Sequence, residues 1–130
     1  MAPTILLLED EPLILMDLEY AAQDFGYTTL SAGSVGEALS VIAKHGLQIT
    51  TAVLDVSLGE GSTCLPVARE LDRIGVPFIL HSGDLDRHDE MIRTLDAELI
   101  AKPAPSEKVI AAAIAYALGD EGESTRIAAQ

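Results

Sequence analysis

Short apolar runs alternate with longer amphipathic segments along almost the whole chain. Brief continuous apolar runs are typical of strands buried on both faces, and apolar residues spaced three and four apart are typical of helices that cover a sheet. The runs predict five strands, at residues 4–8, 27–31, 49–54, 77–81 and 98–101. The segments that follow them predict five helices, at about residues 12–25, 35–45, 62–74, 85–95 and 106–118.

Residues that start and stop helices stand at the expected boundaries. Pro12 fits the first turn of a helix, where its missing N–H leaves no hydrogen bond unmade, and Gly26 stops that helix. Ser34 and Glu37 have the spacing of a capping box, and Ser106 is placed to cap the last helix. These signals support the alternating pattern.

The alternation predicts an α/β fold, with a doubly wound five-stranded parallel sheet between two layers of helices (α/β/α). The flavodoxin-like strand order 2-1-3-4-5 is common for chains of this size, and we expect it here. No internal repeat or linker divides the chain. We therefore expect one domain over residues 1–119 and a short, polar, frayed tail over residues 120–130.

The formal net charge of −13 excludes several classes of partner. Phosphate backbones and anionic lipids would repel such a chain, so we expect no binding to nucleic acid or to membranes. The single cysteine, Cys64, excludes an internal disulfide and fits a reducing compartment, which predicts a cytoplasmic protein. The N-terminus has no basic region before its short apolar run, so it predicts neither a signal peptide nor a membrane span.

Polar and charged residues follow four of the five predicted strands. Glu9 and Asp10 follow the first strand, Asp55 the third, Ser82 the fourth and Lys102 the fifth. Ligands of open α/β sheets bind at the carboxyl ends of the strands, so we expect these side chains at one edge. Two like charges about 4 Å apart repel by about 4 kcal/mol at an effective dielectric constant of about 20. The acidic cluster must therefore take up protons or bind a cation.

The residue types in this cluster favour Mg2+ and phosphoryl transfer. Carboxylate oxygens suit a hard ion that keeps some of its waters. A carboxylate can also act as a nucleophile towards phosphorus, so Asp55 would carry the phosphoryl group and Ser82 and Lys102 would bind it. The three histidines fall at no zinc-ligand spacing, and we expect them at the surface or at strand ends: His45, His81 and His88.

Four segments add a signal through their order and spacing. They are LLLEDEP at the first strand, VLDVSL at the third, PFILHSGD at the fourth and IAKP at the fifth. Together they resemble the receiver domains of two-component response regulators, over about residues 4–118. PFILHSGD, with the glycine-containing loop after Asp55, is similar to the PFxFATGY stretch of stand-alone receivers from alphaproteobacteria.

The resemblance implies a role for each acidic residue. Asp55 would be the phosphoacceptor and a metal ligand, Asp10 a direct Mg2+ ligand, and Glu9 a ligand through water. The backbone carbonyl of Ser57 would supply a further metal ligand.

The resemblance also extends to the fourth and fifth strands. Ser82 matches the family's switch hydroxyl and Lys102 its lysine, and the Lys102–Pro103 bond is usually cis in such domains. Three features depart from the family. Leu99 stands where an aromatic residue commonly moves with the hydroxyl, Asp84 stands where the alphaproteobacterial subgroup has its aromatic residue, and the loop after the phosphoacceptor lacks a common proline.

The resemblance implies a stand-alone response regulator in a phosphorelay. A sensor histidine kinase or a phosphotransfer protein would phosphorylate Asp55 in the presence of Mg2+. Movement of Ser82 would then reposition the fourth helix and the fifth strand, and the signal would pass by contact to a downstream protein. We expect a monomer or weak homodimer that catalyses only its own phosphorylation and dephosphorylation.

Other functions remain open on the residues alone. One is a degenerate receiver that acts only as a protein-binding module. Another is a haloacid-dehalogenase-like phosphatase, which would need a second aspartate where this chain has Ser57. A dinucleotide fingerprint could begin at Gly59 and Gly61, but its third glycine position holds Cys64 and Glu60 would face the pyrophosphate.

Overall fold

The computed structural model describes residues 2–59, 61–83, 95 and 97–119. The helix predicted at residues 85–95 and the predicted tail therefore lie, apart from residue 95, outside the described residues. In chain order the described elements are β1 (Thr4–Leu8), α1 (Pro12–Asp24), β2 (Thr28–Ala32), α2 (Val35–His45), the short 3-10 helix η1 (Gly46–Gln48), β3 (Ile49–Asp55), α3 (Leu65–Ile74), β4 (Phe78–Ser82), β5 (Glu98–Ala101) and α5 (Ser106–Leu118).

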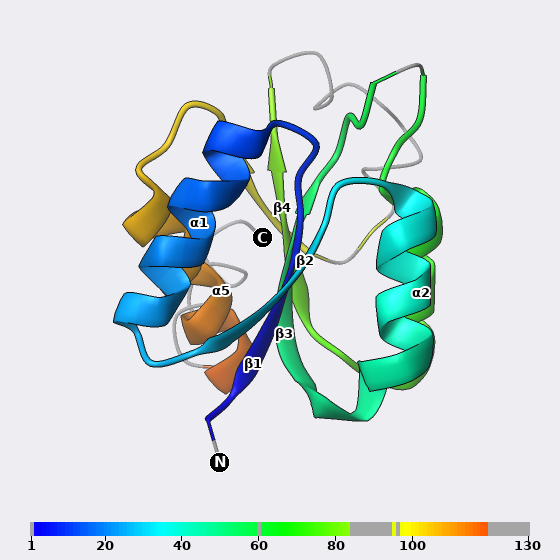
Figure 1. The fold of residues 1–130 in the computed structure, drawn as a ribbon, viewed down its shortest axis with the longest axis horizontal. Helices are drawn as coiled ribbons and strands as arrows, with labels where there is room; N and C mark the ends of the chain where they lie inside the picture. The colour runs from blue at the N-terminus through cyan, green and yellow to red at the C-terminus, as the bar shows by residue number, and fades with distance from the viewer. Residues whose placement is uncertain (1, 60, 84–94, 96, 120–130) are drawn as a thin grey trace.

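The five strands form one parallel sheet in the order β2-β1-β3-β4-β5. Helices α1 and α5 cover one face, and α2 and α3 cover the other (Figure 1). The predicted fold class and strand order are confirmed. In this order β1 and β3 are central neighbours, and β4 separates β3 from β5.

Two apolar clusters form the core, one on each face of the sheet. Consecutive strand residues point to opposite faces. Leu6, Leu8 and Leu54 therefore pack beneath α2 and α3, whereas Leu7 and Val53 pack beneath α1 and α5. The same alternation decides towards which face of the sheet the side chain of each polar residue at a strand end points.

Helix α1 rests on the sheet through a narrow strip of residues, chiefly Leu18, Ala21 and Ala22. The helix has a second apolar stripe, and this one is exposed to solvent: Leu13, Met16 and Tyr20. Apolar periodicity therefore identified the helix correctly but could not choose which of its two apolar stripes is buried.

The predicted start of the third helix at residue 62 was wrong, because the chain forms a turn there first. The Ser62 N–H donates to the Gly59 carbonyl at 2.8 Å, and the Leu58 N–H donates to the Ser62 carbonyl at 3.0 Å. Gly59 and Gly61 both have a φ in the left-handed region, at 75° and 79°, which other residues rarely adopt. Helix α3 consequently begins at residue 65.

One predicted cap is confirmed and the other was wrong. The Glu37 N–H donates to Ser34 Oγ at 3.2 Å, while Glu37 Oε1 accepts from the Gly33 N–H at 3.1 Å. Ser106 is already the first helical residue of α5, and Pro105 precedes it without a capping side chain. Proline fixes φ near the helical value, which suits it to this boundary.

Candidate functional site

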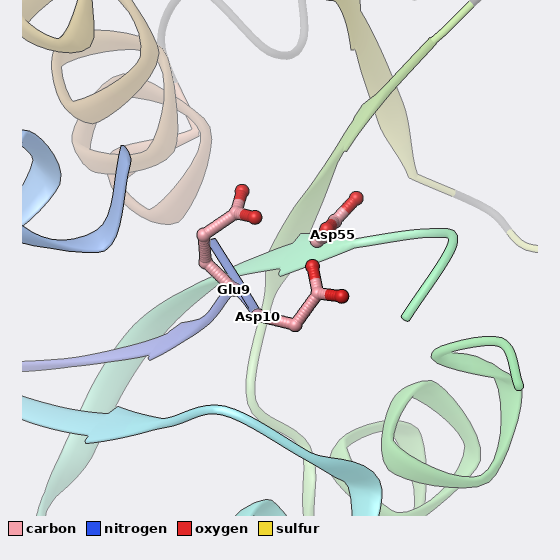
Figure 2. A group of neighbouring side chains, drawn as sticks. All are labelled: Glu9, Asp10 and Asp55. Carbon is pink, nitrogen blue, oxygen red and sulfur yellow. The ribbon is translucent and has the colours of Figure 1, made fainter. Parts of the chain in front are cut away.

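Three carboxylates converge at the carboxyl edge of the sheet. Leu8 of β1 is the register partner of Leu54 of β3, so Glu9 and Asp55, the residues that directly follow these two, are neighbours. Figure 2 shows Glu9, Asp10 and Asp55 extending from the two strand ends into the same region. One carboxylate oxygen from each residue lies within 4.8 Å of the other two. The structure thus brings together the acidic residues predicted from the sequence.

The three carboxylates differ sharply in their exposure to solvent. Glu9 and Asp55 are buried, with 1% and 3% of their surfaces exposed, whereas Asp10 is exposed. Asp55 therefore lies at the floor of the site, and Asp10 lies at its open side.

Lys102 supplies the positive charge of the site. Its Nζ lies 3.1 Å from Glu9 Oε1 and 3.3 Å from Asp55 Oδ1. The other Glu9 oxygen, Oε2, accepts a hydrogen bond from the Glu11 N–H at 3.1 Å. Both oxygens of Glu9 are thus engaged by the protein. The peptide bond between Lys102 and Pro103 is cis, as the resemblance implies.

The site carries more negative charge than its one lysine balances. Burial, followed by the charge of Glu9, raises the pKa of Asp55 to about 8, although Lys102 acts in the opposite direction. Burial lowers the pKa of Lys102, but Asp55 and Glu9 together outweigh it, and the net shift is upward. The carboxyl group of Asp55 therefore tends to hold a proton until a further cation joins the site.

Ser82 ends β4, between the strands that carry Asp55 and Lys102. It is fully buried, and its Oγ has no hydrogen-bond partner among the described residues. The Ser82 carbonyl accepts a hydrogen bond from the Lys102 N–H at 2.8 Å, which fixes the backbone of Lys102 relative to β4. The residue predicted to act as the switch therefore lies at the carboxyl edge of the sheet, on the strand between β3 and β5.

The loop after β3 forms one wall of the site. Ser57 pairs with Thr63 in an isolated antiparallel bridge, which closes the loop on itself. A Cβ placed on Gly59 would lie 3.5 Å from Asp10 Oδ2, so the glycine backbone passes directly beside that carboxylate. Ser57, the predicted carbonyl ligand, therefore belongs to a loop that runs against the open side of the cluster.

The donor set suits a hard divalent cation. Three carboxylates within one ion's reach, one of them open to solvent, match the oxygen ligands and retained waters that Mg2+ prefers. Cys64, the only cysteine of the chain, is packed in the core beneath α2 and α3. The cluster is compatible with Mg2+, and among the described residues no histidine or cysteine joins it.

The sequence did not predict that His81 is buried beside Asp55. It was expected near the surface or at a strand end, and it does lie near the end of β4, but only 4% of its surface is exposed. It is the register partner of Asp55, so it belongs to the immediate surroundings of the site. One feature of the sequence could have indicated this position. His81 directly precedes Ser82, in a strand that is expected to lie next to β3.

Comparison with solved structures decides the family. The response regulator receiver protein from Sinorhizobium medicae WSM419 matches with a TM-score of 0.77 and 27% identity, over 89% of this chain and 94% of that one. SdrG from Sphingomonas melonis Fr1 matches with a TM-score of 0.74 and 33% identity, over 90% and 97%. The chain belongs to the receiver domains of response regulators. No protein-family model matches this receiver domain.

A curated relative agrees with this assignment. The receiver domain is 33% identical, over 104 residues or 79% of its length, to the phyllosphere-induced regulator PhyR of Methylorubrum extorquens AM1. It spans 39% of the length of that relative. The match supports the alphaproteobacterial type of receiver and a regulatory role. None of the helices within the described part of the receiver domain has the length and apolar character needed to cross a membrane.

Proposed function

We propose that this receiver domain accepts a phosphoryl group on Asp55 from the phosphohistidine of a sensor kinase or phosphotransfer protein. The observation that carries the proposal is the arrangement around Asp55. Its buried carboxylate lies beside Glu9 and Asp10 and 3.3 Å from the Lys102 ammonium, at the edge where α/β sheets bind ligands.

The reaction is a direct displacement at phosphorus. An Asp55 oxygen attacks the phosphorus atom, the N–P bond of the phosphohistidine breaks, and its electron pair stays on the imidazole nitrogen, which takes up a proton. The product is an acyl phosphate on Asp55. A bound Mg2+ would neutralise the carboxylates and the phosphoryl oxygens, and so would keep Asp55 ionised for the attack.

Asp10, Asp55 and the backbone carbonyl of Ser57 would hold the metal directly. Glu9 would act through water, which agrees with the engagement of its two oxygens by Lys102 and a backbone N–H. Asp10 is the exposed member of the cluster, so an ion can reach it without disturbing the core.

Lys102 and Ser82 would bind the product. The Lys102 ammonium can pass from the carboxylates to a phosphoryl oxygen, which keeps a charge-assisted contact throughout. The buried hydroxyl of Ser82 would donate to another phosphoryl oxygen and gain the hydrogen bond that it lacks among the described residues. Movement of Ser82 towards the phosphoryl group would start the signal.

The signal would leave the site by protein–protein contact with a downstream protein. Leu99, on β5, packs partly buried against the core cluster beneath α2 and α3, in place of the aromatic residue common in the family. The helix that Ser82 would reposition was predicted at residues 85–95, largely outside the described residues.

Phosphate uptake measured by mass tests the proposal. The wild-type protein, incubated with acetyl phosphate and Mg2+, should gain the mass of one phosphoryl group in its intact mass spectrum. Asp55→Ala should gain none, and chelation of Mg2+ should prevent the gain in the wild type. Asp17→Ala, an exposed acid on α1 away from the cluster, should behave like the wild type. Equal uptake by Asp55→Ala would place the acceptor elsewhere and overturn the proposal.

A further inference from the structure

His81 is a buried polar residue that the proposed phosphoryl chemistry does not use. Neither of its ring nitrogens has a hydrogen-bond partner among the described residues, and only 4% of the residue is exposed. An unpaired buried polar group destabilises the state in which it is unpaired. A state of the protein in which the imidazole gains a hydrogen-bond partner is therefore stabilised relative to the state in which it has none.

The register of the sheet places His81 beside Asp55, on the strand that Lys102 crosses. His81 pairs with Asp55 on one side and with Ile100 on the other, and these three residues point to the face covered by α1 and α5. Lys102 follows Ile100 by two residues and begins on the same face. Because β4 lies between β3 and β5, the lysine side chain crosses the end of β4, which carries His81, to reach Asp55.

The imidazole is suited to accept a hydrogen bond. Burial, followed by the positive charge of Lys102, lowers the pKa of His81 to about 4, so at neutral pH the ring is uncharged and one nitrogen carries a free lone pair. The effect of Lys102 on His81 also shows that the two side chains are electrostatic neighbours.

A role as the base that activates water does not fit this position. Water attacks an acyl phosphate in line with the bond that breaks, from the side of phosphorus opposite Asp55. His81 lies beside Asp55 within the sheet, on the protein side of that bond. The imidazole therefore faces Lys102 and Asp55, and the attacking water would be beyond its reach.

Lys102 loses acceptors when the site is loaded. Its ammonium has three N–H donors, and in the free protein it forms ion pairs with Glu9 and Asp55. Oxygens that serve a metal ion or an acyl phosphate are weaker acceptors, so the ammonium needs a new partner beside its contact with the phosphoryl group.

We propose that His81 is a positioning residue for Lys102: with a phosphoryl group on Asp55, the neutral imidazole accepts a hydrogen bond from the Lys102 ammonium and holds it against the phosphoryl oxygens. This inference rests on the proposed phosphorylation of Asp55. The stretch PFxFATGY, which residues 77–84 resemble, has Ala at the position of His81, so this contact would be a feature of this chain.

Two substitutions separate the hydrogen bond from the packing. His81→Leu fills similar space without an acceptor, and His81→Gln keeps an acceptor. Binding of beryllofluoride with Mg2+, a stable mimic of the phosphoryl group, is measured for both by titration calorimetry. We expect His81→Leu to bind about tenfold more weakly, which corresponds to about 1.4 kcal/mol, and His81→Gln to stay within about threefold of the wild type. Ile79→Val, on the same face of β4, controls for packing and should bind like the wild type.

The imidazole itself supplies a second readout. In 15N spectra of the wild type, the signal of the acceptor nitrogen of His81 should shift when beryllofluoride binds, at constant pH. Wild-type affinity in His81→Leu, equal losses in His81→Leu and His81→Gln, or an unshifted nitrogen signal would each overturn the positioning role. Absence of phosphate uptake by the wild type in the mass experiment would instead reject the phosphorylation of Asp55, and this inference with it.

Discussion

The Lys102 ammonium lies 3.1 Å from Glu9 Oε1, although two strands of the sheet separate the ends from which these side chains extend. Glu9 follows β1 and Lys102 follows β5, with β3 and β4 between them. The side chain of Glu9 is fully buried, and that of Lys102 is 21% exposed. The contact therefore closes the carboxyl edge of the sheet with a largely buried ion pair that also includes Asp55.

Removal of the Lys102 ammonium should destabilise the folded protein. Lys102→Met leaves Glu9 buried without its ion-pair partner, and loss of one partner of a buried ion pair costs about 3 kcal/mol or more. We expect a loss of about 3 kcal/mol in the free energy of unfolding at pH 7, measured by urea denaturation without Mg2+. Lys108→Met, at an exposed lysine of α5, should change it by less than about 0.5 kcal/mol. Similar losses in both variants would show that the ion pair does not stabilise the fold.

The raised pKa of Asp55 predicts that its contribution to stability falls as the pH rises, which is the opposite of the behaviour of a carboxyl group whose pKa is lowered by folding. The folded state holds a proton on Asp55 up to about pH 8, whereas the unfolded chain releases it near 3.8. The contribution of Asp55 to stability is therefore greatest below pH 3.8 and falls as the pH rises towards 8.

Asp55→Asn isolates this contribution, because the amide does not titrate. In the absence of Mg2+ the variant should be more stable than the wild type by several kcal/mol at pH 8, and the difference should shrink as the pH falls towards 4. Urea denaturation of both proteins across this range measures it. If the difference in stability between the two proteins did not change with pH, folding would not raise the pKa of Asp55.

His81 predicts the opposite slope in a lower window. Its pKa is about 4 in the folded protein and 6.5 in the unfolded chain, so the unfolded state binds more protons between these values. Its contribution to stability is complete above pH 6.5 and is lost as the pH falls towards 4. At about 1.36 kcal/mol per pKa unit, the loss amounts to about 3 kcal/mol. His81→Leu should remove this component of the pH dependence of unfolding, and an unchanged profile in that variant would contradict the burial of the neutral ring.

The sequence predicted the acidic cluster because its position depends only on where buried strands end. Short apolar runs fixed the ends of β1 and β3 to within one residue, and parallel topology brought Glu9, Asp10 and Asp55 to the same edge. Lys102 followed from the same argument. These residues needed no knowledge of side-chain packing.

Features that depend on packing could not be predicted in the same way. Helix α1 carries apolar residues on two stripes, and only the contact with β1 and α5 decides that Leu18 is buried while Leu13 and Tyr20 are exposed. The burial of His81 depends on the register between β3 and β4, which no single strand contains. The start of α3 depends on a turn whose hydrogen bonds compete with an early helix start.

Mg2+ should stabilise the folded protein through the cluster, because the unfolded chain does not hold the three carboxylates together. A ligand at about 100 times its dissociation constant adds about 2.7 kcal/mol to the free energy of unfolding. We expect a gain of this size in saturating MgCl2, measured by urea denaturation against NaCl of equal ionic strength. Asp10→Ala should lose most of the gain, since Asp10 is the exposed carboxylate of the cluster, whereas Asp17→Ala should keep it. An equal gain in Asp10→Ala would contradict the proposed role of Asp10 as a direct ligand of the ion.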